Sequence, residues 1–135
     1  LSLNPGKVYL TGVSQGGIGT WGMASDAAHA SRFAAIAPVC GGFVHGNKAR
    51  RAANLADTPV WAFHGANDVI VPSYISAKLV DALRKAGASE DDARATIYPE
   101  APTPPGWPTS VGHASTIPTY ANPDLYAWLL RHRLA

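Results

Sequence analysis

The stretch Lys7–Gly17, which reads KVYLTGVSQGG, decides the fold of this 135-residue chain. Residues 7–13 form an apolar, β-branched run that predicts a buried strand. Residues 15–30 predict a helix that follows at once. Ser14 then lies in a sharp strand-to-helix turn with the pattern G-x-S-x-G. Side chains two positions before and two after it would collide, and both positions are glycine. The pattern predicts a serine hydroxyl raised above the edge of a sheet.

The rest of the chain alternates between strand and helix patterns. Three further apolar runs predict strands at residues 33–39, 59–64 and 93–98. Three further helices are predicted: residues 47–56, a periodic segment with Ile75, Leu79, Leu83 and Ala86, and a terminal helix capped by Asn122 and Pro123. Residues 99–118 contain too many prolines for a long regular element. This alternation predicts one α/β domain over residues 1–135, built on a parallel sheet.

Composition excludes several classes of protein. With 47% hydrophobic and 15% charged residues, the chain does not resemble a disordered segment. Its net charge of +2 is too small to indicate a nucleic-acid partner. No apolar run approaches the roughly 18 residues of a membrane span. Cys40 is the single cysteine, so an internal disulfide is excluded, and its place at the end of an apolar run indicates a small buried side chain.

A nucleophilic serine needs a base, and the base needs an orienting carboxylate. In folds with this turn the chain order is serine, acid, histidine. Asp68 follows the third predicted strand, at the carboxyl end where active-site residues of parallel sheets gather. Asp57 and Asp81 are weaker candidates, because the first precedes its strand and the second lies within a helix. The backbone N–H of Gln15, at the start of the first helix, is the predicted oxyanion donor.

Chain order also selects the base. It disfavours the three histidines that precede Asp68, which are His29, His45 and His64. His132 lies near the end of the terminal helix, where a histidine faces the helix dipole favourably. His113 remains, in the loop after the fourth predicted strand, from which an imidazole can reach Ser14. The sequence therefore predicts a triad of Ser14, His113 and Asp68.

Three motifs resemble the α/β-hydrolase superfamily: Gly12–Gly17 (GVSQGG), His64–Asp68 (HGAND) followed by Val71-Pro72, and Gly112-His113. Residues 7–12 and 123–130 further resemble the branch of phospholipase/carboxylesterases, feruloyl-esterase-like enzymes and polyhydroxyalkanoate depolymerase-like enzymes. The resemblance implies a serine esterase that cleaves small carboxylic esters through an acyl-enzyme intermediate. Members of this branch often carry Trp three residues after the histidine, where this chain has Thr116.

The resemblance also implies that the chain is the C-terminal half of the fold, with about four parallel strands, flanking helices and no N-terminal strands. Only 13 residues precede Ser14. The strand predicted at residues 7–13 would then be a free sheet edge that pairs with a missing N-terminal segment, a second chain or a second copy. The second oxyanion donor, which comes from the absent half, would be lacking too.

Two other functions stay open beside the esterase. One is a prolyl-oligopeptidase-like serine peptidase, and the other is a non-catalytic half-domain. Trp107 and Tyr74 are candidates for binding the acyl or alcohol part of a substrate. No metal or organic cofactor is expected, because the histidines and acids lack ligand spacing and one cysteine cannot anchor a thiolate cluster.

Overall fold

Four parallel strands form the centre of the structure, a computed structural model that describes residues 2–42 and 45–135. They follow one another across the sheet in chain order: β1 (Tyr9–Val13), β2 (Ala35–Val39), β3 (Val60–Gly65) and β4 (Ala93–Tyr98). The register pairs Tyr9 with Ala35 and Val60 with Ala93. All four strands therefore point their carboxyl ends to the same edge of the sheet. This confirms the predicted parallel α/β architecture.

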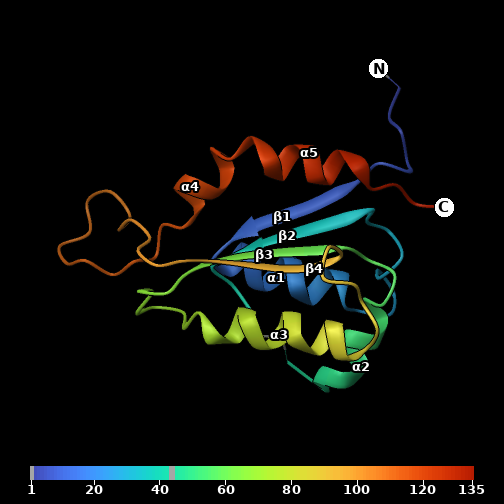
Figure 1. Cartoon of the computed structure of the whole chain (residues 1–135), viewed down its shortest axis with the longest axis horizontal. Coiled ribbons are helices and arrows are strands. Elements are labelled where there is room, and N and C mark those ends of the chain that lie inside the picture. Colours follow the sequence, from blue (N-terminus) through green and yellow to red (C-terminus); the bar gives the residue numbers. More distant parts are fainter. Residues whose placement is uncertain (1, 43–44) are drawn as a thin grey trace.

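Helices cover both faces of this sheet (Figure 1). One face carries three of them: α1 (Gln15–Ala24), α2 (Lys48–Asn54) and α3 (Tyr74–Lys85). The other face carries α4 (Thr116–Tyr120) and α5 (Pro123–Arg131). In the described ranges 2–42 and 45–135, no helix has the length and apolar character needed to cross a membrane.

Two apolar cores lie above and below the sheet because strand residues alternate between its faces. Ile36 and Ala62 face the first core, where they pack with Trp21 of α1 and Val80 of α3. The second core takes the alternate strand residues and the inner face of α5: Ala35, Ala37, Trp61, Phe63, Leu125, Trp128 and Leu129. With both faces covered, β2 and β3 are buried along their whole length. This explains why their sequences are continuous apolar runs rather than alternating ones.

The first helix is shorter than its sequence predicts. It ends at Ala24 instead of continuing to residue 30. The side chain of Asp26 accepts a hydrogen bond from the backbone N–H of Ala28 at 2.9 Å. Such a local turn gives the backbone an alternative to the helical ladder. Residues 25–32 are accordingly turns and bends that lead into β2.

Two other elements differ from expectation near the site. Helix α3 buries Ser76, Val80 and Leu83, whereas Ala86 of the predicted face is exposed. This rotation brings a polar residue, Ser76, to the inside. Helix α4 interrupts the segment predicted as a loop, with Pro118 within its first turn. Proline is tolerated there because first-turn N–H groups have no partner inside a helix.

The inner face of α5 should contribute strongly to stability. Leu125 is 1% exposed and Leu130, on the same helix, is 59% exposed. We expect Leu125→Ala to lower the free energy of unfolding by about 2–5 kcal/mol, because it removes buried methyl groups and leaves a cavity. Urea unfolding followed by tryptophan fluorescence measures this loss. Leu130→Ala is the matched control and should change the value by less than about 0.5 kcal/mol; equal losses in the two variants would contradict the packing.

Candidate active site

The turn at Ser14 is a strained elbow between β1 and α1. Its backbone has φ 57° and ψ −113°, a region that residues other than glycine rarely adopt. The Ser14 N–H donates to the carbonyl of Val39 at 2.9 Å, and the Ser14 carbonyl accepts from the N–H of Ile18 at 2.9 Å. The backbone is thus bonded to the neighbouring strand on one side and to the helix on the other. The predicted strand–serine–helix arrangement is present.

The two glycines around Ser14 act differently from each other. A Cβ at Gly12 would collide with the backbone carbonyl of Gly16. A Cβ at Gly16 would meet nothing within 4 Å, so the expectation of a clash at both positions is wrong for this one. Position 12 must lack a side chain because the first turn of α1 folds back over it. The sequence pattern shows that both positions are glycine, but it does not show at which of them a side chain would collide.

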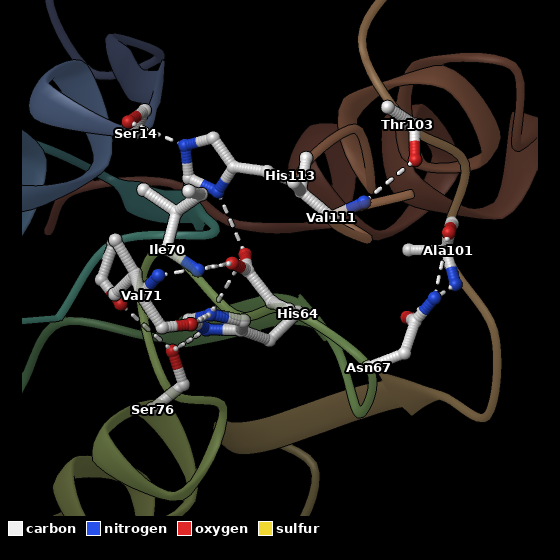
Figure 2. Close-up of polar contacts among 12 residues, drawn as sticks. Ser14, His64, Asn67, Ile70, Val71, Ser76, Ala101, Thr103, Val111 and His113 are labelled. Atoms are coloured by element: carbon white, nitrogen blue, oxygen red, sulfur yellow. Dashed lines mark hydrogen bonds and ion pairs between the residues drawn. The ribbon is translucent and has the colours of Figure 1, made fainter. Parts of the chain in front are cut away.

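Ser14, His113 and Asp68 form one continuous chain of hydrogen bonds (Figure 2). Ser14 Oγ lies 2.8 Å from His113 Nε2, and His113 Nδ1 lies 2.7 Å from Asp68 Oδ2. A carboxylate only accepts, so Nδ1 carries the proton and Nε2 presents its lone pair to the serine hydroxyl. The three residues come from the ends of β1 and β3 and from the loop after β4. The structure brings together the triad that the sequence predicts.

Asp68 is held at its other oxygen by the backbone. Its Oδ1 accepts from the N–H groups of Ile70 and Val71, each at 2.9 Å. The Asp68 side chain has no solvent exposure. A buried carboxylate needs such compensation, because burial without partners is costly. The tight turn after β3 therefore orients the carboxylate and supplies hydrogen-bond donors to its Oδ1.

The loop that carries His113 is tied to this same turn. Asn67 donates from Nδ2 to the carbonyl of Ala101 at 3.0 Å, and its Oδ1 accepts from the Ala101 N–H at 2.7 Å. The N–H of Val69 donates to the carbonyl of Val111 at 3.0 Å. These bonds join two loops that are more than thirty residues apart. Sequence reasoning missed Asn67, although an amide beside the acid could have suggested a clamp.

A second histidine lies against the acid. His64, which chain order excludes as the base, is fully buried, and its Nε2 is 3.5 Å from Asp68 Oδ2. Its nearer partners are Ser76 Oγ, 2.8 Å from Nδ1, and the carbonyl of Val71, 2.7 Å from Nε2. Burial lowers the pKa of His64, and the Val71 carbonyl and Asp68 only partly oppose this. The ring is therefore neutral at neutral pH.

One cluster of ligand-type side chains occurs within residues 2–42 and 45–135. Cys40, Asp68 and His113 are buried with ligand atoms within 4.8 Å of one another. Asp68 and His113 already satisfy each other and their backbone and serine partners. Burial raises the pKa of the Cys40 thiol, which disfavours the thiolate that a metal needs. The donor set fits the triad better than a resident metal.

An open hollow of about 420 Å³ lies beside Ser14 and His113. Its other walls are mainly apolar: Val13, Ile70, Pro104, Pro105, Trp107 and Ile117, with Thr116 also present. The rings of Trp107 and His113 have centroids 6.3 Å apart. Tyr74 does not line this hollow; it lies in another, where Lys78 Nζ is 5.2 Å from its ring centroid. The structure thus brings Trp107, one of the two aromatic residues predicted to bind substrate, to the hollow beside Ser14, and places the other, Tyr74, elsewhere.

The N-terminus of α1 directly follows Ser14. Gln15 is the first residue of that helix, so its N–H has no acceptor inside the helix. The helix dipole adds partial positive charge, about +0.5, at this end. These features favour a negative oxygen next to Ser14. The oxyanion role of Gln15 stays a prediction.

Three solved structures similar to this chain have the names of hydrolases. A thermostable esterase is 32% identical, with a TM-score of 0.78 over 97% of this chain and 32% of its own. A putative dienelactone hydrolase from Klebsiella pneumoniae is 26% identical, with a TM-score of 0.64 over 91% of this chain and 51% of its own. An acylaminoacyl peptidase, 16% identical, shares the fold with a TM-score of 0.64 over 97% of this chain and 24% of its own. No protein-family model and no curated protein matches the chain. The chain spans between a quarter and a half of the length of these structures.

The two histidines with a lowered pKa, the buried His64 and the half-buried His132, predict a loss of stability in acid. Burial lowers the pKa of His64 and of His132 from the ordinary 6.5, so below about pH 6.5 the unfolded chain binds more protons than the folded one. The free energy of unfolding should therefore fall as the pH drops from 7 to 5. Urea unfolding at these values measures the slope. His64→Gln should make the slope shallower, and a slope unchanged by this substitution would contradict the assignment to His64.

Proposed function

Because this chain belongs to the α/β-hydrolase superfamily, we propose that it carries the catalytic triad of a serine hydrolase that cleaves carboxylic esters. The observation that supports this best is the unbroken chain of hydrogen bonds from Ser14 through His113 to Asp68. It joins a strained, half-buried serine beside an open hollow to a buried carboxylate through one imidazole. A structural polar network has no need of a strained serine next to an apolar hollow.

The reaction begins with proton transfer inside this chain. His113 Nε2 takes the proton of Ser14 Oγ as that oxygen attacks the ester carbonyl carbon. The carbonyl oxygen becomes an oxyanion, which accepts a hydrogen bond from the N–H of Gln15. His113 then gives its proton to the departing alkoxide, and the acyl group remains on Ser14. A water molecule, activated by the same imidazole, releases the acid and restores the serine.

Asp68 acts through His113 and does not touch the substrate. Its carboxylate fixes the imidazole with Nδ1 protonated and stabilises the imidazolium that forms during each half-reaction. The buried site strengthens this interaction, because few water dipoles screen it. The two backbone N–H groups on Oδ1 keep the carboxylate in place throughout.

The hollow beside Ser14 is suited to an apolar acyl or alcohol group. Trp107 is the largest side chain in its wall, and Pro104 and Pro105 stiffen the segment next to it. We assign Trp107 to contact the substrate there. One of the similar structures is named a thermostable esterase and another a putative dienelactone hydrolase, which supports this choice of substrate class.

Covalent labelling tests the nucleophile. A fluorophosphonate probe should form an adduct on Ser14, and Ser14→Ala should abolish it. The protein should hydrolyse p-nitrophenyl esters, with kcat about 10⁴-fold lower in Asp68→Asn, because an amide that donates to His113 Nδ1 holds the imidazole in the wrong tautomer. Absence of the adduct in a folded protein would refute the mechanism. Faster cleavage of amino-acyl nitroanilides than of esters would instead favour the peptidase.

We also propose that β1 pairs with a strand from polypeptide outside these 135 residues. β1 is an edge of the four-stranded sheet, and Thr11 at its centre is exposed. A free edge presents unpaired backbone groups that favour strand addition. This chain covers only 32% of the similar esterase and 51% of the similar dienelactone hydrolase, which agrees with such an addition.

Hydrogen exchange on the 135-residue chain alone tests the pairing. The outward amides of β1 should exchange faster than those of the central strand β2, and sedimentation should show self-association through this edge. Ester turnover should be roughly 10²- to 10³-fold slower than in a longer chain that adds a second oxyanion donor. A monomer with β1 amides as protected as those of β2, and with full activity, would contradict the proposal.

A further inference from the structure

The second histidine of the site has a bonding pattern that the triad does not use. His64 lies near the carboxyl end of β3 and is 0% exposed. Its two ring nitrogens contact Ser76 Oγ at 2.8 Å and the Val71 carbonyl at 2.7 Å (Figure 2). Both distances lie within the range of good hydrogen bonds. His64 is thus a fully buried imidazole with both nitrogens hydrogen-bonded, next to Asp68, and the proposed reaction does not use it.

The proton positions on this ring follow from its partners. The Val71 carbonyl can only accept, so His64 Nε2 carries a proton and donates it. In the neutral ring Nδ1 is then an acceptor. The Ser76 hydroxyl has one proton and two acceptors in reach, His64 Nδ1 at 2.8 Å and the Gly41 carbonyl at 3.2 Å, and we assign the proton to the nearer Nδ1. His64 is therefore a fixed donor toward the turn that follows it, whereas His113 presents an acceptor to Ser14.

Val71 links His64 to Asp68. Its carbonyl accepts from His64 Nε2 at 2.7 Å, and its N–H donates to Asp68 Oδ1 at 2.9 Å. Both polar groups of one peptide residue are thus engaged, one by the histidine and one by the carboxylate. Rotation of this residue would break both bonds. The closeness of His64 Nε2 to Asp68 Oδ2, 3.5 Å, also limits the space into which the carboxylate can turn.

We propose that His64 is a positioning residue, which holds Val71 so that the turn at residues 68–71 presents Asp68 Oδ2 to His113. His64 does not touch the substrate or the reacting atoms. The kinetic part of this proposal rests on the proposed hydrolytic function, but the positioning of the Asp68–His113 pair does not. The two can be tested separately.

Two neutral substitutions separate the contacts of the ring. The side-chain amide nitrogen of His64→Gln reaches the place of Nε2 and can donate to the Val71 carbonyl. The shorter amide of His64→Asn reaches the place of Nδ1 and keeps only the contact with Ser76. Ser76→Ala is the third variant, which removes the Nδ1 partner but leaves the donation to Val71 intact.

The proton between His113 Nδ1 and Asp68 Oδ2 provides a direct readout. An imidazole N–H bonded to a buried carboxylate gives a far-downfield proton NMR resonance, which Asp68→Asn should abolish and Ser14→Ala should keep. We expect His64→Gln and Ser76→Ala to keep this resonance and His64→Asn to lose or broaden it. In an active enzyme, kcat should fall between about tenfold and a hundredfold in His64→Asn, with KM little changed, and by less than about threefold in His64→Gln.

The outcomes decide the proposal at each step. Urea unfolding first shows which variants fold. A folded His64→Asn variant that keeps both the resonance and kcat overturns the proposal, and so does a folded His64→Gln variant that loses the resonance. If His64→Asn does not fold, His64→Gln decides alone. The expected NMR pattern in a protein without esterase activity would support the positioning role while refuting the proposed function.

Discussion

The strained turn at Ser14 is the constraint on which the site depends. A residue with φ 57° costs of order 1–3 kcal/mol and persists only where its surroundings hold it. Here β2 accepts the Ser14 N–H, and the first turn of α1 folds over Gly12. The helix can come this close because residues 17 and 41 are both glycine. A Cβ at either position would collide with the backbone of the facing segment. The strain is thus balanced by packing between α1 and the ends of β1 and β2.

The neighbouring strand ends in a similar way. Cys40, directly after β2, is the other residue in the described ranges that has a positive φ and is not glycine, at 39°. Its N–H donates to the carbonyl of Phe63 in β3 at 2.8 Å. The chain therefore turns sharply at two adjacent strand ends, at the edge where the triad lies.

The remaining triad members reach this edge through loops that are fixed to each other. Asn67 clamps the backbone at Ala101, and Val69 bonds to Val111 next to His113. Prolines in the segment between these contacts reduce the freedom of the unfolded chain, so ordering it costs less entropy. His64 supports the acid from below through Val71. A long loop can therefore place the imidazole of His113 next to Ser14, because neighbouring segments bond this loop at several points.

Much of the fold could be predicted because its signals are local. Each of these signals acts within a few residues: the apolar runs predict the strands, Asn122 predicts the start of the terminal helix, and Gly12 predicts the sharp turn at Ser14. One prediction failed because a local turn competes with the helix, and another because a contact made in the tertiary structure decides which helix face is buried. Helix α1 stops early at an aspartate turn, and α3 is rotated so that Ser76 reaches His64.

The sequence by itself determined the strand–helix alternation and the identity and order of Ser14, Asp68 and His113, because hydrophobic period and turn chemistry are written in neighbouring residues. Only the tertiary structure decided which atoms meet, since those partners are 45 and 99 residues apart along the chain. It also placed Trp107 in the hollow beside Ser14 and Tyr74 elsewhere. It gave His64 a place beside the acid that chain order could not show, because such contacts depend on how strands and loops pack rather than on the order in which they occur.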